Sequence, residues 1–500
     1  MQREAAPHPN VFSGLSTKIL QYAPGAIVPA VFGVLNSVIF TRLLRAGEYG
    51  RFSLVISIVT TAAAVLTQSL QQGITRFLPT VDNESSASEM KAAVALACGT
   101  IVVTTGIVVV IVATGRWMTV DEQWTSLVWP GVGLFLVTAI MGPLSAVLQG
   151  EMRAKRHATY SVIGVMLKFA LSLALVLGCR REPSSLLIAG VMSQAIIAVP
   201  MWRDAGIRFP SLSGLAHSRA VASLGRMLQY GFPMVGYCVA ASLLAVGDRY
   251  VIQYFRGEAE VGVYAANYSL VSWGLGLVTA PVLLAAHPFF MKAWGMGNRG
   301  EAANWLGVIT ELYLGAGALL VGGLVVFSRD VAWVALGAEF REGHRIMPVV
   351  LAGVIAWQVA MYTHKPLEFA GRTRSILVLS LSTAALNVIA NVWLVPKYGY
   401  VAAAYTTLGC YSVYALWTAV LGQRVLKWTL DWTRLGGHVA VVVAGLSATG
   451  LLREWAAAQA GYVPGLLTAV VGSATTSAVV LYRLFRPFAA RAITTPIAGA

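Results

Sequence analysis

Long apolar runs separated by short polar segments are the dominant pattern of this chain. Each run is long enough, or nearly so, to cross the roughly 30 Å hydrocarbon core of a membrane as an α-helix that rises about 1.5 Å per residue. The pattern predicts an all-α polytopic membrane protein with about 14 transmembrane helices. The runs cover residues 22–40, 52–69, 92–113, 128–148, 160–178, 185–201, 232–252, 264–286, 305–327, 346–362, 376–394, 401–421, 437–452 and 464–482.

Composition supports the same class of protein. Of the 500 residues, 57% are hydrophobic and 11% are charged, and the mean hydropathy is +0.70, which excludes a soluble globular chain. The segments between the runs are too short to fold into a catalytic domain, so the chain is not expected to be an enzyme. No GxxxxGK[ST] motif is present, which excludes an ATP-driven pump in a single chain.

Lysine and arginine are unevenly distributed between the two sides that this topology defines. The side with both chain ends carries 22 of the 36 basic residues and the opposite side carries 13, while Lys168 lies inside a run. Because cytoplasmic loops are enriched in Lys and Arg, both termini are predicted to be cytoplasmic. The net charge of +15 then follows from topology and from anionic inner-leaflet lipid, so no nucleic-acid partner is expected.

The four cysteines, Cys98, Cys179, Cys238 and Cys410, lie far apart and have no metal-like spacing. We interpret them as small buried hydrophobic residues and expect neither a metal site nor a cofactor. The first apolar run has no A-x-A-like cleavage site behind it, so it is expected to remain as a helix.

Two short patterns recur along the chain at nearly equal displacements. Glu-x-Gly-x-aromatic occurs at residues 48–52 and again at 260–264, which is 212 residues later. Pro-Leu followed by a glycine and paired basic residues occurs at 143–155 and again at 366–374, where the glycines are 221 residues apart and the basic residues 219. These displacements predict a duplicated unit of six helices.

The duplication divides the chain into four parts. Residues 1–201 are expected to form an N-terminal lobe of six spans, and residues 232–421 a C-terminal lobe of six spans. Residues 202–231, with spaced basic side chains, are expected to form a cytoplasmic amphipathic linker in the membrane interface. Residues 422–500 add two appended spans and a cytoplasmic tail. Since each repeat has an even number of spans, both lobes have the same orientation in the membrane.

Several motifs, in this order and spacing, resemble the polysaccharide-transporter branch of the multidrug, oligosaccharidyl-lipid and polysaccharide exporter superfamily. The resemblance covers essentially the whole chain. The motifs are RLLxxxEYG at 42–50, Asp248-Arg249 with VGxY at 261–264, prolines at 281 and 288, GAEF at 337–340, LExxGR at 367–372, and Asn387 with VPxYG at 395–399.

This resemblance implies a flippase with two lobes around a central cavity. Such proteins move undecaprenyl-pyrophosphate-linked oligosaccharide repeat units across the bacterial inner membrane by alternating access, for O-antigen, capsule or exopolysaccharide assembly. The implied partners are the lipid-linked oligosaccharide and membrane lipids, with H+ or Na+ as a candidate coupling ion and a polysaccharide polymerase as a candidate partner. The related lipid II flippases carry several arginines within the first, second and eighth spans. Here those spans hold none until their ends, so lipid II is not the expected substrate.

Two other functions stay open at this stage. A cation-coupled exporter of drugs or small molecules from the same superfamily would use an anionic cavity, and Glu311 is the only support for one. A membrane-embedded glycosyl polymerase or ligase would usually carry a large outer loop with arginines and histidines. The sequence has no such loop.

Lys168 is the main candidate for substrate binding. It lies near the middle of the fifth run, where a basic group costs about 2.5–3.5 kcal/mol on insertion scales, so it should face the interior of the bundle. There it would suit a pyrophosphate or an acidic sugar, and the alternative is that it snorkels to the interface. The further candidates are arginines that close their spans and uncharged polar residues, some of which instead bond between helices. They are Arg42, Arg76, Arg249, Asn36, Gln68, Asn267, Asn387 and Asn391.

Two acidic residues are candidates for gating or ion coupling. The 15 uncharged residues 232–246 are too few to carry Asp248 and Arg249 clear of the membrane, so both are expected inside its edge or facing a wet interior. With Arg42 they would form part of an outer gate. Glu311 is about two turns into the ninth span. It either couples a proton or pairs with a basic residue.

Overall fold

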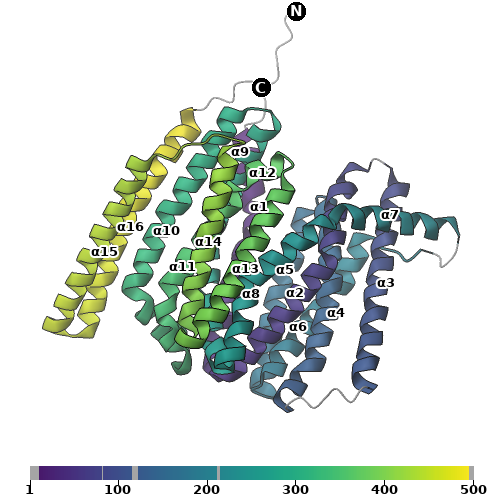
Figure 1. Ribbon diagram of the computed structural model, residues 1–500, viewed down its shortest axis with the longest axis horizontal. Helices are drawn as coiled ribbons and strands as arrows, with labels where there is room; N and C mark the ends of the chain where they lie inside the picture. Colours follow the sequence, from purple (N-terminus) through teal and green to yellow (C-terminus); the bar gives the residue numbers. More distant parts are fainter. Residues whose placement is uncertain (1–10, 82, 115–121, 211–213, 495–500) are drawn as a thin grey trace, which may run out of the picture.

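The computed structural model describes residues 11–81, 83–114, 122–210 and 214–494, and Figure 1 shows a bundle of long helices. The described residues form α-helices and short 3-10 helices without a strand. The first half contains α1 (Val11–Leu43), α2 (Ala46–Phe77), η1 (Leu78–Thr80), α3 (Glu84–Thr114), α4 (Glu122–Gly150), α5 (Ala154–Gly178), α6 (Pro183–Ala205) and α7 (Leu215–Gly231). The second half contains α8 (Pro233–Arg256), α9 (Glu258–Gly295), α10 (Arg299–Ala335), η2 (Ala338–Ile346), α11 (Met347–Thr363), α12 (Lys365–Phe369), α13 (Thr373–Tyr398), α14 (Tyr400–Gln423), α15 (Trp432–Ala460) and α16 (Tyr462–Thr494).

The all-α polytopic fold predicted from the apolar runs is confirmed. Eleven segments of the described residues are long and apolar enough to cross a membrane, and the long helices α1, α9 and α14 run alongside them (Figure 1). Each of the fourteen predicted runs therefore falls on a long helix of its own. The chain is a multi-pass membrane protein.

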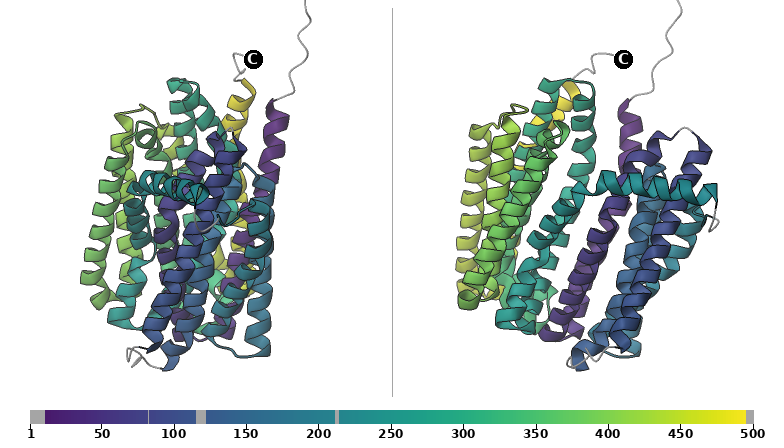
Figure 2. Two further views of the ribbon diagram at one scale, coloured as in Figure 1. Left: turned by 90° about the vertical axis from the view of Figure 1, so that its right-hand side faces the viewer. Right: turned by 45° about the vertical axis from the view of Figure 1, so that its right-hand side comes forward.

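Helix α7, between the two halves, is the exception to this parallel arrangement. It lies across the other helices in Figure 2. One face is buried at Ala220 and Met227 against α2 and α3, while Val221 and Arg219 are exposed. That amphipathic pattern matches the predicted interfacial linker, whose place in a membrane stays a prediction.

Each half has apolar clusters of its own. One apolar cluster joins α2, α3, α4, α6 and α7 around Leu148 and Met201, and two others lie within α8 to α14. The hairpin of α15 and α16 packs against α10, and within it Gly445 and Gly472 contact threonines of the opposite helix. Small residues let membrane helices approach closely where no hydrophobic effect drives them together.

The two ends of the bundle differ. Helix α1 begins and α16 ends at one end, which we call the proximal end (Figure 2). The opposite, distal end carries the α1–α2 and α8–α9 connections and η2. There one core cluster contains residues of both halves, including Phe40 and Leu44 from the first and Tyr264 and Phe340 from the second. The halves are thus sealed together distally by apolar packing.

Candidate functional site

The distal contact is centred on two glycines, where α2 crosses α9. A Cβ atom added to Gly50 would collide with the carbonyl oxygen of Glu258, and one added to Gly262 with that of Ala46. The two backbones therefore touch, which only glycine permits. Both glycines belong to the repeated Glu-x-Gly-x-aromatic pattern, so equivalent parts of the two repeats pack against each other. We call this crossing, with the polar contacts described next, the distal seam.

Glu258 at the start of α9 holds two helices of the first half. Its Oε2 atom is 2.5 Å from Nη1 of Arg51 on α2, and its Oε1 atom accepts a 3.0 Å hydrogen bond from Nε1 of Trp124 on α4. The side chains of Arg51 and Glu258 are only 14% and 23% exposed. Their ion pair is therefore partly screened from water and stronger than a surface pair.

Arg249 crosses the seam from α8. Its Nη1 atom donates to the hydroxyls of Ser53 at 3.0 Å and Ser57 at 2.9 Å, both on α2, and its guanidinium lies 5.9 Å from the ring centroid of Tyr268. Arg249 does not close its helix, because α8 continues for two more turns to Arg256, and its position at a membrane edge stays a prediction. An apolar run can end while the helix goes on, provided that the charges find partners.

Asp248, next to it, has a different role. The side chain is 1% exposed and accepts hydrogen bonds from the hydroxyls of Tyr264 and, at 3.4 Å, Thr407. Its Oδ1 atom also accepts the backbone N–H of Arg249 at 2.8 Å. All these partners belong to the second half, so Asp248 fastens α8 to α9 and α14 and does not itself bridge the seam.

Arg42 does lie at the distal end of its helix, as the sequence indicates. It donates to the carbonyl of Val334 on α10. Nearby, the backbone N–H of Gly337 donates to the hydroxyl of Thr41 at 3.2 Å. These bonds tie the end of α1 to the end of α10.

Lys168 lies on the inner face of α5. At 3.6 residues per turn, the exposed Ile163, Met166 and Leu177 lie on the opposite face, whereas Ser172, one turn further on, is 1% exposed. Among the described residues, its ammonium group has neither a hydrogen-bond nor an ion-pair partner. A partly buried, unpaired cation inside a membrane bundle marks a candidate binding site for an anion.

The remaining polar candidates fall into two groups. Asn267 is 0% exposed and donates to the carbonyls of Val263 at 2.8 Å and Phe340 at 2.9 Å, which fixes η2 onto α9. Asn391 donates to Asn387 at 3.0 Å, within the packed contact of α13 and α14. These residues hold helices together.

The others are less engaged. Asn36 donates to the carbonyl of Phe32 in its own helix at 2.7 Å. Gln68 is partly buried on α2, and Arg76 is exposed near the proximal end of the same helix. The structure therefore does not gather the predicted polar residues into one cluster.

Glu311 on α10 is engaged in an ion pair. Its Oε2 atom is 3.4 Å from Nη1 of Arg434, and its Oε1 atom accepts the backbone N–H of Asp431 at 2.7 Å. The carboxylate thereby holds the start of α15 against α10. Of the two alternatives set by the sequence, this geometry favours a partner of a basic residue.

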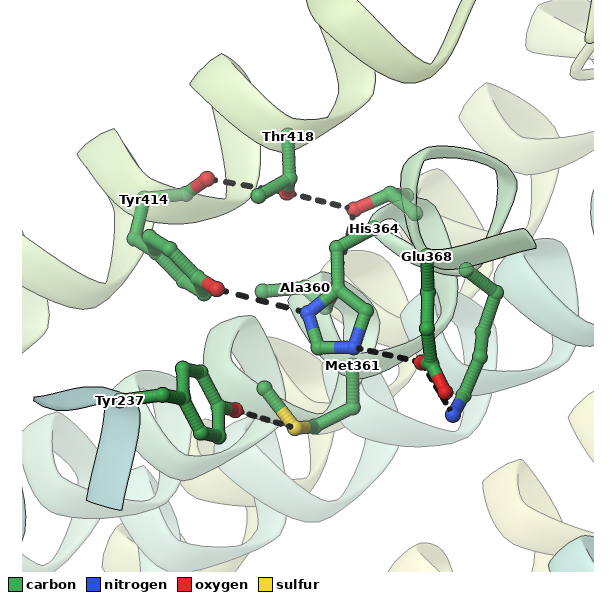
Figure 3. Close-up of polar contacts among 9 residues, drawn as sticks. Tyr237, Ala360, Met361, His364, Glu368, Tyr414 and Thr418 are labelled. Carbon is green, nitrogen blue, oxygen red and sulfur yellow. Dashed lines mark hydrogen bonds and ion pairs between the residues drawn. The ribbon is translucent and has the colours of Figure 1, made fainter. Parts of the chain in front are cut away.

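Sequence reasoning gave no role to a polar cluster at the α11–α12 corner (Figure 3). The Nδ1 atom of His364 is 3.4 Å from the hydroxyl of Tyr414, and its Nε2 atom is 3.8 Å from Glu368. Thr363 and Thr418 share a hydrogen bond of 2.8 Å beside it. The cluster fastens the corner to α14. No group of three or more His, Cys, Asp or Glu residues suited to a metal ion occurs within the described part of the chain.

A second missed contact joins α10 to the last two helices. Arg453 on α15 pairs with Asp330 at 2.8 Å and donates to the carbonyl of Val326 at 2.9 Å, and the hydroxyl of Tyr462 bonds to Asp330. Such pairs depend on which distant helices meet. Neither residue stands out by spacing alone.

Beside this contact lies an apolar groove with a volume of about 840 Å³. It is bounded by α9, α10 and α16, with contributions from α1, α11 and α15. Asp330, already paired, is the only charged residue among the described residues that line it. Most of the others are aliphatic, including Leu270, Leu275, Leu320, Leu324, Leu466 and Val470.

Several solved structures share this arrangement of helices. The lipid II flippase MurJ, in an inward closed conformation, superposes with a TM-score of 0.71 at 10% identity, covering 94% of this chain and 99% of that one. An inward-facing multidrug resistance MATE family transporter of the MOP superfamily gives a TM-score of 0.60 at 14% identity, covering 83% and 95%. A MOP superfamily transporter from Pyrococcus furiosus gives 0.57 at 15% identity, covering 82% and 95%. No curated protein matches the sequence.

The chain thus shares its fold with a lipid II flippase and with transporters of the MOP superfamily. The polysaccharide biosynthesis protein family model matches residues 17–294, more than half of the chain. The chain belongs to that family and to the polysaccharide-transporter branch of the superfamily, which confirms the resemblance stated from the motifs.

Proposed function

We propose that this protein is an inner-membrane flippase for undecaprenyl-pyrophosphate-linked oligosaccharide repeat units. In this proposal the headgroup moves from the cytoplasmic to the outer leaflet, for O-antigen, capsule or exopolysaccharide assembly. The proximal end is cytoplasmic, as the excess of basic residues on that side indicates. Residues 1–201 and 232–421 move as two lobes about the distal seam.

The observation that carries this proposal is Lys168. Its ammonium group, on the inner face of α5, has no partner among the described residues, and such a charge is costly in a membrane protein unless a ligand compensates it. A pyrophosphate supplies that charge together with strong hydrogen-bond acceptors. The lysine is therefore the group most suited to hold the headgroup.

The apolar groove along α9, α10 and α16 supports a lipid-linked substrate. Its lining offers aliphatic contacts to a polyprenyl chain, and few of the described lining residues are polar. A tail in this groove would stay in contact with the membrane while the headgroup moves through the protein. A small soluble drug would not need such a groove.

The acidic residues are less suited to a cation-coupled drug exporter. Glu311 is paired with Arg434, and Asp248 accepts hydrogen bonds from two hydroxyls. A carboxylate that is already satisfied has little to offer a cationic drug. This favours the flippase over the exporter.

Transport of a lipid-linked oligosaccharide by purified protein in proteoliposomes tests the proposal. The Lys168→Ala variant should lose transport at normal abundance, while Lys168→Arg should keep part of it because the positive charge remains. Lys427→Ala, at an exposed position, is the matched control. Full transport by Lys168→Ala would show that the lysine only snorkels, and export of cationic drugs without lipid transport would establish the other function.

A further inference from the structure

A cavity of about 610 Å³ lies at the distal end beside the seam. One wall comes from the end of α1 and the α1–α2 connection, and the other from the end of α10 and η2. A hydrogen bond from the backbone N–H of Ala46 to Glu339, residues 293 positions apart, links these walls. We call this cavity the distal pocket.

The pocket carries an excess of positive charge. Arg42, Arg45 and Arg341 line it against a single carboxylate, Glu339. Within the described ranges, none of the three guanidinium groups forms an ion pair. Arginine binds phosphate and carboxylate groups through parallel hydrogen bonds, so this charge suits an anionic ligand.

An exposed tryptophan adjoins the arginines. Trp333 is 62% exposed, and the guanidinium of Arg341 lies 5.2 Å from its ring centroid. A tryptophan at this end of a helix has an ordinary explanation as an anchor at the membrane interface. That explanation does not account for three arginines around it. Together they offer a flat apolar surface for a sugar ring and cations for a phosphate.

The floor of the pocket is shared by the two halves of the chain. A Cβ on Gly337 would collide with the carbonyl oxygen of Thr41, so the backbones of η2 and α1 touch there. Arg42 also bonds across this contact to Val334. The pocket has its present shape only while the distal end is closed, and any ligand that it binds must favour that state.

We propose that the distal pocket binds the phosphate-bearing headgroup of a lipid or glycolipid at the outer face of the membrane. The bound headgroup stabilises the closed distal end. Only the outer orientation and the link to a transported product rest on the proposed function. Recognition of a phosphate by the arginines does not depend on it.

Titration of inorganic pyrophosphate into full-length detergent-purified protein, followed by calorimetry, tests the site. All variants are made in the Lys168→Ala background, so that the proposed interior site does not contribute. Changing both Arg45 and Arg341 to Gln should raise the dissociation constant at least about tenfold, because two charge-assisted contacts are lost. The control changes Arg180 and Arg181 to Gln, which lie in the exposed α5–α6 connection and outside the pocket.

Trp333→Ala provides a second variant that keeps every charge, and it should weaken binding of a phosphorylated sugar more than binding of pyrophosphate. Equal pyrophosphate affinity in the parent and the Arg45/Arg341 variant would overturn the proposal. So would an equal loss in the Arg180/Arg181 control. Failure of lipid transport with intact pyrophosphate binding would reject the flippase function and leave the pocket standing.

Nanodiscs distinguish the two sources of the headgroup. If phosphatidylglycerol discs weaken pyrophosphate binding relative to phosphatidylcholine discs, the pocket takes a membrane lipid headgroup. If the two discs give equal affinity, a phosphatidylglycerol headgroup does not occupy the pocket, which leaves the headgroup of the translocated glycolipid. Either outcome supports the pocket, provided that the Arg45/Arg341 variant has lost binding.

Discussion

The distal seam and the surroundings of Lys168 differ in whether their charged groups have partners within the protein. At the seam, Arg51 pairs with Glu258 and Arg249 donates to two serines. The ammonium group of Lys168 has no such partner among the described residues. Charged groups that are paired within the protein hold helices in place, whereas an unpaired charged group remains able to bind a ligand. The comparison separates the part of the molecule that sets its conformation from the part suited to the headgroup.

The same contrast explains how a seam made of many contacts can still open. The glycine crossing brings backbones together without interlocking large side chains. The polar groups around it are hydroxyls, an indole and one ion pair near the distal surface. When water enters, it can replace each of these partners, so opening exchanges one set of hydrogen bonds for another.

The largest effect expected at the seam comes from filling the crossing. Gly262→Ala adds a methyl group where the carbonyl of Ala46 lies, so the seam cannot close without a backbone shift that costs about 1–3 kcal/mol. Lipid transport in proteoliposomes should fall by roughly tenfold or more, because the closed state is depleted. Gly409→Ala, where the added methyl meets no atom within 4 Å, is the control. Normal transport by Gly262→Ala would mean that the crossing is not part of the cycle.

A smaller effect separates the two neighbours in α8. Arg249→Gln removes charge-assisted bonds to Ser53 and Ser57, worth on the order of 1–3 kcal/mol, and should populate the open state. Asp248→Asn alters contacts only within the second half and should shift the seam less. The measurement is labelling of a single cysteine at Val263, in a cysteine-free background, by an impermeant thiol reagent from outside.

Faster labelling in Arg249→Gln than in Asp248→Asn is the expected order. The reverse order would assign the gate to the aspartate and contradict the contacts seen here. Equal labelling in both variants and in the parent would show that neither residue controls the distal end.

Much of this fold is readable from the sequence, since fourteen apolar runs and one duplication fall on the observed helices. The repeat also identifies Gly50 and Gly262 as equivalent. It does not reveal that they touch, because the period of a repeat contains no information on which faces of distant helices meet. The partners of Glu258 and the Asp330–Arg453 pair are hidden for the same reason.

Helix ends and polar roles are predicted less well. The uncharged stretch of α8 stops before Asp248, but the helix continues to Arg256, and both charges find partners in α2, α9 and α14. From the sequence, Asn267 and Asn387 cannot be distinguished from asparagines that line a sugar path. In the structure both are buried between helices. The position of Lys168 on the inner face of α5 follows from the helical period together with the exposure of the neighbouring residues. The sequence alone suggests that position only through the cost of placing a charge in the membrane.

The smallest expected effect concerns Glu311, and it sharpens the difference between structural and functional charges. Glu311→Gln removes the ion pair with Arg434, whose side chains are 14% and 30% exposed, but keeps an oxygen that can accept the N–H of Asp431. A loss of about 1 kcal/mol or less in the free energy of unfolding is expected, seen as a fall of a few degrees at most in the thermal unfolding temperature of the detergent-purified protein.

Transport and its dependence on an imposed H+ or Na+ gradient should not change, because the carboxylate is occupied by a partner in the protein. Glu182→Gln, in a more exposed pair with Arg180, is the control for charge removal. Loss of gradient dependence in Glu311→Gln, with transport otherwise retained, would instead identify this carboxylate as the coupling site. A charged group that is paired within the protein would then have a role in transport.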